Sequence, residues 1–225
     1  MRIPAQIANL LTTTAVALAL ATPAHAEFQL QAYGGANSNL DSKVKTRQGA
    51  VNDSRTVSWD GKSLSMPPYW GVRGTYWFDR QSPWGIALDY THAKAYADLN
   101  FATDPTYSHL EFTDGINIYT VNAMYRFQNK TSPWGFYVGG GPGISVPSVE
   151  VSLKAAPTQT TKEYQIGGFA AQVLAGAEYK FTDKWSAFGE GKFSYTKIDG
   201  DLPNNGSVKT ELWSPQVAVG VAYRF

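Results

Sequence analysis

Apolar and polar residues alternate along four long segments of the chain. The alternation is clearest at the C-terminus, where large apolar side chains share one parity and small or polar side chains share the other. The apolar set comprises Trp213, Pro215, Val217, Val219, Val221, Tyr223 and Phe225. Residues 70–78, 119–127 and 169–181 repeat the pattern. A period of two predicts β-strands that have one apolar face and one polar face.

Short polar turns follow the segments at residues 70–78, 119–127 and 169–181. Each turn leads to a tryptophan, at Trp84, Trp134 and Trp185, and these residues are 50 and 51 positions apart. Such a repeat is typical of an array of hairpins. A new alternating run starts at each tryptophan, and residues 28–32 supply one further strand. The pattern therefore predicts eight strands.

The remaining four connections are long and polar, at about residues 37–68, 98–115, 154–163 and 199–209. Short turns at one rim, long loops at the other and an even number of strands are typical of an outer-membrane barrel. A closed barrel also satisfies every backbone hydrogen-bonding group inside hydrocarbon. We therefore expect an all-β fold, an eight-stranded antiparallel transmembrane β-barrel in the bacterial outer membrane, present as a monomer.

A soluble lipocalin-like barrel or sandwich, with its apolar parity turned inward, is the alternative fold. The charges on the non-aromatic parity argue against it, because they fit a wet or ion-paired lumen. The reverse orientation would leave the aromatic residues as a large patch in water. The charged residues of this parity are Arg73, Asp89, Arg126, Glu178, Lys180, Glu190, Lys192 and Arg224.

The N-terminus has the three parts of a secretory leader. A basic start at Arg2 precedes an apolar stretch over residues 10–20, and Ala24 and Ala26 are the small residues of a cleavage site. We predict a signal peptide at residues 1–26 and one outer-membrane β-barrel domain at residues 27–225. Loss of Arg2 leaves equal numbers of acidic and basic residues.

The composition and the absence of certain motifs exclude several kinds of functional site. Of the 225 residues, 43% are hydrophobic, 14% aromatic and 16% charged, and none is cysteine. The missing cysteine excludes disulfides, cysteine-bound metals and thiol catalysis. The balanced charge gives no basic excess for nucleic acid. No serine lies in a nucleophile motif, and no glycine-rich phosphate loop joins a strand to a helix.

An eight-stranded barrel has an interior just wide enough for side chains, so a diffusion pore is not expected. Charged residues of the inward parity then pair across the lumen, and Asp89 and Glu190 are the two with a possible catalytic role. Function is expected at the loop rim or on the lipid face.

The segment around the third and fourth strands carries the candidate chemistry. The outward parity continues from Tyr90 to His92 and Lys94, so these two cations are expected at headgroup level, as snorkelling cations or as phosphate or metal ligands. His92 and His109, with Asp98, Glu111 and Asp114 nearby, make a histidine–carboxylate metal site chemically possible.

Three segments resemble lipid A oxidases, which are outer-membrane proteins of rhizobial-type bacteria. They are residues 59–74 (WDGKSLSMPPYWGVRG), 88–98 (LDYTHAKAYAD) and 110–115 (LEFTDG). The resemblance implies that the proximal glucosamine of lipid A is converted to 2-aminogluconate with dioxygen. The lipid A headgroup would be the partner.

The resemblance leads us to expect certain site residues. The family offers no assigned catalytic residue that can be mapped onto this chain. The candidate catalytic residues are Asp60, Asp89, His92 and Glu111, with Asp60 as a base. A divalent metal ion would be held by His92, Asp98 and Asp114, and the lipid by Lys62, Arg73, Lys94 and Tyr96. His92 and Asp89 have opposite parity, so a bulge would be needed for both to reach one metal.

The alternative function is a non-catalytic barrel of the OmpA or OmpW type, with a structural, adhesive or small-ligand-binding role. Convergence of Asp60, His92, Lys94 and Glu111 on one pocket would favour the enzyme, and their dispersal would favour the alternative.

Overall fold

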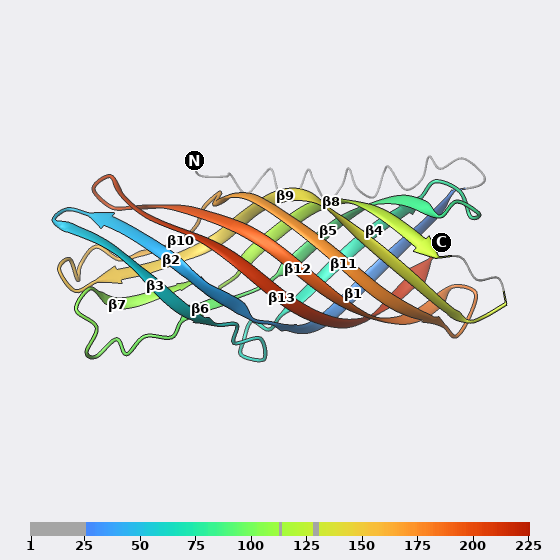
Figure 1. Ribbon diagram of the computed structural model, residues 1–225, viewed down its shortest axis with the longest axis horizontal. Coiled ribbons are helices and arrows are strands. Elements are labelled where there is room, and N and C mark those ends of the chain that lie inside the picture. Colours follow the sequence, from blue (N-terminus) through green and yellow to red (C-terminus); the bar gives the residue numbers. More distant parts are fainter. Residues whose placement is uncertain (1–25, 113, 128–130) are drawn as a thin grey trace.

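A computed structural model describes residues 26–112, 114–127 and 131–225. Within these residues, eight strands form one closed antiparallel ring, because each pairs with the next and β1 pairs with β13 (Figure 1). In ring order they are β1 (Glu27–Asn37), β4 (Trp70–Trp77), β5 (Trp84–His92), β8 (Ile116–Phe127), β9 (Trp134–Leu153), β11 (Gly168–Lys180), β12 (Trp185–Leu202) and β13 (Gly206–Arg224). The predicted eight-stranded barrel is confirmed. Residues 1–25 of the predicted leader lie outside the described residues.

Three short connections join β4 to β5, β8 to β9 and β11 to β12, where the sequence predicts turns. Backbone bonds tighten two of them, because the N–H of Phe78 donates to the carbonyl of Trp84 and the N–H of Phe181 to that of Trp185, both at 3.2 Å. The strand ends that these connections join lie at the same end of the barrel as the C-terminus (Figure 1). In the described part of the chain, no helix is long and apolar enough to span a bilayer.

The apolar parity faces outward, as predicted. Aromatic side chains form two bands around the barrel, and aliphatic or small residues fill the space between them. The band near the short turns includes Trp84, Tyr125, Trp134, Tyr179, Trp185 and Tyr223, and the outer band includes Trp70, Tyr90, Tyr119, Phe169, Tyr195 and Trp213. Aromatic rings prefer both interfaces of a bilayer, so the two bands mark the limits of the membrane-spanning part.

The long connections contain strands, which corrects the prediction of loops. β2 (Asn39–Gln48) and β3 (Val51–Asp60) form a hairpin, and β6 (Ala95–Ala97), β7 (Tyr107–Phe112) and β10 (Thr161–Tyr164) complete the set. β2 pairs with the outer end of β13, β7 and β10 pair with the outer end of β9, and β3 and β6 link β2 to β7. We call the five strands and the outer ends of β9, β12 and β13 the outer platform, which occupies one end of the long axis (Figure 1).

The outer platform has its own apolar core inside the ring. The core side chains are almost completely buried and come from β2, β3, β7, β9, β12 and β13: Val44, Val57, Trp59, Tyr107, Leu110, Phe112, Val149, Val151, Leu153, Ile198, Leu202, Val208 and Leu212. Trp59 packs on Phe112 with their ring centroids 5.7 Å apart, and its indole N–H donates to Ser42 Oγ. Burial of this apolar surface is the reason that the connections are ordered strands.

The orientation of the apolar face can be tested with Val219→Arg. Val219 is 69% exposed and lies midway between the two aromatic bands. Arginine at the bilayer midplane should lower the free energy of unfolding by about 2–4 kcal/mol. Ser207→Arg, outward on the same strand but within the platform, should cost less than about 1 kcal/mol. Urea titration of the protein in phospholipid vesicles measures both, and equal costs would contradict the assigned orientation.

Candidate functional site

Four charged side chains meet at the centre of the barrel, and we call Arg73, Asp89, Glu190 and Lys192 the lumen network. The Arg73 guanidinium is completely buried and donates to Asp89 Oδ2 at 2.9 Å and to both carboxylate oxygens of Glu190 at 2.6 and 2.8 Å. β4 and β5 place Arg73 opposite Asp89 in the register, and β12 brings Glu190 from across the lumen. The ion pairing expected from the inward parity is present.

Lys192 and two neutral donors complete the lumen network. Lys192 Nζ lies 3.1 Å from Asp89 Oδ2 and donates to Thr91 Oγ1 at 2.7 Å. Tyr137 donates to Glu190 at 2.8 Å, and Gln172 donates to Asp89 at 2.8 Å. Buried charges are tolerated when they are both paired and hydrogen-bonded. The network therefore fills the centre of the lumen with paired side chains.

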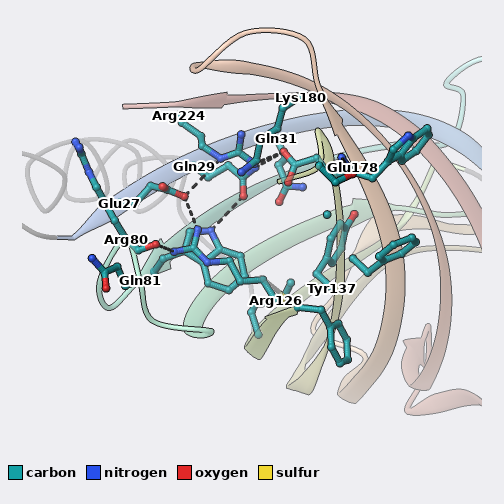
Figure 2. A pocket seen from close by; sticks show the side chains of 17 residues that line it. Glu27, Gln29, Gln31, Arg80, Gln81, Arg126, Tyr137, Glu178, Lys180 and Arg224 are labelled. Atoms are coloured by element: carbon teal, nitrogen blue, oxygen red, sulfur yellow. Dashed lines mark hydrogen bonds and ion pairs between the residues drawn. The ribbon is translucent and has the colours of Figure 1, made fainter. Parts of the chain in front are cut away.

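A cavity of about 380 Å³ lies inside the barrel at the short-turn end, between the lumen network and the mouth (Figure 2). Four of its charged side chains pair with one another. Arg126 contacts Glu27 at 2.6 Å, and Arg224 contacts Glu178, which also accepts from Gln29 at 2.9 Å. Figure 2 shows these side chains directed toward one another, so the cavity is a polar vestibule that ends at the lumen network.

Several candidate residues lie in one row on the outside of the platform. The strand register sets Asp60 beside Tyr96, Tyr96 beside Glu111, Glu111 beside Glu150 and Glu150 beside Lys162. Side chains at paired positions project from the same face of a sheet. We call these five residues the carboxylate row. Asp60, Tyr96 and Glu111 were predicted from the sequence, whereas Glu150 and Lys162 were not.

Cations and an imidazole flank the carboxylate row. Lys62 Nζ lies 3.0 Å from the centroid of the Tyr96 ring, and the Lys62 backbone N–H donates to Asp60 Oδ1 at 2.9 Å. His109 Nε2 lies 2.8 Å from Glu111 Oε1. Ligand atoms of His109, Glu111 and Glu150 lie within 4.8 Å of one another, the one such group of three among the described residues. The donor set of one imidazole and two carboxylates suits a divalent transition metal.

His92 and Lys94 are not free at headgroup level, contrary to the prediction. His92 is on the outward face, but it is only 5% exposed because the chain at Gly115 covers its ring. Its Nδ1 contacts Asn117 Oδ1 at 3.1 Å. The Lys94 ammonium donates to the carbonyl oxygens of Ser65 and Pro67 at 3.0 and 3.1 Å, beneath the segment that they belong to. Burial lowers the pKa of Lys94.

The structure separates the other candidates. Arg73 and Asp89 lie in the lumen, far along the strands from the platform. Asp98 is exposed at the end of β6, and Asp114 pairs with Lys162 at 3.3 Å. Among the described residues, His92, Asp98 and Asp114 do not form a group that could hold one ion. The expected set therefore divides between the lumen network and the carboxylate row.

The closed ring, the outward apolar face and the paired lumen together define an integral outer-membrane β-barrel. A family model of the outer membrane protein beta-barrel domain matches residues 11–225, and the chain belongs to this family. The protein is therefore a protein of the bacterial outer membrane. No curated protein matches the chain.

Solved outer-membrane barrels are similar at low identity. Neisserial surface protein A is 18% identical with a TM-score of 0.49, over 88% of this chain and 97% of that chain. The N-terminal barrel domain of Pseudomonas aeruginosa OprF is 14% identical with a TM-score of 0.46, over 88% and 97%. Ail, the attachment invasion locus protein of Yersinia pestis, is 12% identical with a TM-score of 0.40, over 89% and 99%.

Replacement of Arg73 tests the lumen network. Arg73→Met leaves Asp89 and Glu190 without their guanidinium partner, so the free energy of unfolding should fall by about 3–5 kcal/mol. Lys209→Met removes an ion pair of the same N–O distance, 2.9 Å to Asp199, but at an exposed position, and should cost less than about 1 kcal/mol. Urea unfolding in detergent micelles compares the two, and a small cost for Arg73→Met would contradict the assigned role.

The segment between β6 and β7 packs beside the carboxylate row and is held by Asp104. Asp104 Oδ1 accepts the N–H groups of Thr106 and Tyr107 at 2.8 and 2.7 Å, and its Oδ2 accepts Arg55 Nη1 at 2.7 Å. The Phe101 ring of the same segment lies 5.8 Å from the His109 ring. Burial alone would raise the pKa of Asp104, but these N–H donors and the Arg55 charge lower it below its usual value.

A pH titration should reveal the contribution of Asp104. Because its pKa is lower in the folded protein than in the unfolded chain, its stabilisation is complete at neutral pH and is lost as the pH falls below about 3.9 toward the folded pKa. Amide hydrogen exchange at Thr106 and Tyr107, corrected for intrinsic rates, should be constant from pH 7 to pH 5 and accelerate at lower pH. Asp104→Asn should exchange faster at pH 7 and lose this dependence; an unchanged pH profile would contradict the assignment.

Proposed function

We propose that the protein is a non-catalytic outer-membrane barrel that presents the outer platform as a ligand-binding surface outside the cell. The observation that carries this proposal is the buried apolar core of the platform, formed by segments that a simple barrel would leave as loops. A rigid surface loses little conformational entropy when a partner binds. The structural and adhesive roles expected as the alternative function agree with this arrangement.

The lumen supports a binding role over a transport role. The side chains of Arg73, Asp89, Glu190 and Lys192 fill the centre and are paired. Any small molecule that entered the vestibule would meet this network before it reached the platform. Binding at the outer surface needs no passage through the barrel.

The binding role can be tested with the protein in nanodiscs on a glycan array and on immobilised collagen, laminin and fibronectin. A variant in which residues 44–55 are replaced by Asn-Gly removes most of the β2–β3 hairpin. A matched variant changes only the turn residues Gly49 and Ala50 to Asn-Gly and keeps the hairpin. We expect at least one probe to bind the native protein and the turn variant, and to bind the trimmed variant at least tenfold more weakly.

Heat-modifiable migration in gel electrophoresis checks that the trimmed barrel is still folded. A platform-based binding function would be contradicted if the native protein bound none of the probes. It would also be contradicted if the trimmed variant bound a probe as tightly as the native protein does.

The second candidate function is oxidation of lipid A, and the carboxylate row favours it. Asp60, Tyr96 and Glu111 lie together on the outward face of the platform, and Lys62 contacts Tyr96. Leu64 and Met66, 90% and 85% exposed on the adjoining segment, offer apolar contacts to a lipid. Lys62 is the cation placed to meet a lipid phosphate, with Asp60 beside it as a base.

Oxidation would need a redox group and a co-substrate. Conversion of the glucosamine hemiacetal to a lactone removes two electrons and two protons, which dioxygen would accept to give hydrogen peroxide; hydrolysis of the lactone then gives the aminogluconate. His109, Glu111 and Glu150 supply the donors that fit a divalent metal ion, which would provide the redox chemistry. This set differs from the His92, Asp98 and Asp114 set expected from the resemblance.

Mass spectrometry of lipid A tests the second function. Lipid A is compared from cells with and without the gene, each grown with and without oxygen. An oxygen-dependent gain of one oxygen atom, lost in Glu111→Gln and kept in the exposed control Glu163→Gln, would support an oxidase. Identical lipid A in all four samples would exclude it.

A further inference from the structure

A groove on the platform lies directly above the outer aromatic band. Its volume is about 410 Å³, and β2, β12 and β13 form it. Four lysines line it, Lys43 and Lys45 from β2, Lys197 from β12 and Lys209 from β13. Trp213 lines the edge that faces the membrane. We call this the lysine groove; it shares no residue with the carboxylate row.

The register gives the height of each lysine above the membrane. Tyr195 pairs with Trp213 in the aromatic band, Lys197 pairs with Glu211 one alternating step farther out, and Asp199 pairs with Lys209 one step beyond that. Lys45 pairs with Lys209 and lies at the same level. Two residues of a strand tilted by about 40° rise about 5 Å along the bilayer normal. The ammonium groups therefore lie about 5–10 Å above the aromatic band, the depth of lipid headgroups.

Three of the four lysines have no counter-ion within the described residues. Lys209 pairs with Asp199 at 2.9 Å, whereas no ion pair or hydrogen bond engages the ammonium groups of Lys43, Lys45 and Lys197. Two carboxylates, Asp41 and Glu211, also line the groove, and neither forms an ion pair with these three ammonium groups. Converging cations repel one another, and a bound anion would remove that repulsion.

We propose that the lysine groove binds the phosphate group of an outer-leaflet lipid headgroup. Lys43, Lys45 and Lys197 contact the phosphate, and Trp213 and Tyr195 contact the apolar part of the same lipid at the interface. The position of the groove selects a lipid over a soluble anion, because the aromatic edge continues into the hydrocarbon region. This inference goes beyond the proposed function, since the groove would hold a lipid whatever ligand the platform binds.

The test uses the folded full barrel in micelles of a zwitterionic detergent, titrated with diphosphorylated lipid A and with the same lipid after phosphatase treatment. The variant Lys43→Gln/Lys45→Gln/Lys197→Gln empties the groove of free cations. The control Lys154→Gln/Lys180→Gln/Lys184→Gln removes the same charge from exposed positions elsewhere. Native mass spectrometry gives the dissociation constants.

We expect the native protein and the control to bind the diphosphorylated lipid at least tenfold more tightly than the dephosphorylated lipid. The groove variant should lose this preference, because each lysine near an anionic lipid headgroup contributes favourably to the binding free energy. Equal affinity for the two lipids, or an unchanged preference in the groove variant, would overturn the proposal.

Two further arms distinguish the source of the anion. Inorganic phosphate and a soluble sulfated oligosaccharide are each added as competitors. If neither competitor displaces the bound lipid at millimolar concentration, the result supports a lipid headgroup as the ligand. If either competitor displaces the lipid when it is present at a lower concentration than the lipid, the lipid assignment is overturned.

Discussion

The rest of the structure depends on the ion pairs that the Arg73 guanidinium forms with Asp89 and Glu190 at the centre of the barrel. A barrel that exposes its apolar parity to lipid must turn its polar parity into a narrow lumen. Charged groups there are costly unless each is paired and hydrogen-bonded. Arg73 satisfies two carboxylates from different strands, and Lys192 neutralises the excess negative charge. This arrangement makes the membrane-spanning part a filled anchor, and it moves any ligand-binding role to the surface.

Two different interiors follow each other along the same barrel axis. Between the aromatic bands the interior is ionic and hydrogen-bonded, whereas inside the outer platform it is apolar, with side chains such as Val44, Leu110 and Leu212. The change occurs because the outer face of the platform meets water, so the hydrophobic effect there favours an apolar inside. The lysine groove and the carboxylate row lie on the outside of this second part.

The period-two alternation was enough to predict the eight membrane strands, their turns and the direction of each face. It failed for the platform because the inward positions of β2 alternate apolar Val44 with polar Ser42 and Thr46, so the pattern is weak. β6 is only three residues long, and its pairing with β3 and β7 joins segments far apart in the sequence. Such pairing depends on tertiary packing, which a local pattern does not contain.

The prediction of the candidate site was incomplete for the same reason. Asp60, Tyr96 and Glu111 were named from the sequence and do lie in one row, but Glu150 joins them only through the register of β7 with β9. His92 and Lys94 were expected to be free because parity gives the face of a strand and not what covers it. The segments at Gly115 and at Ser65–Pro67 supply that cover.

Conductance across a planar lipid bilayer shows whether the lumen network fills the barrel. If it does, the inserted, folded protein produces no steady open current at moderate voltage in neutral salt. A stable open channel with a reproducible conductance would show that ions pass Arg73 and its partners, and it would contradict the description of the barrel as a filled anchor.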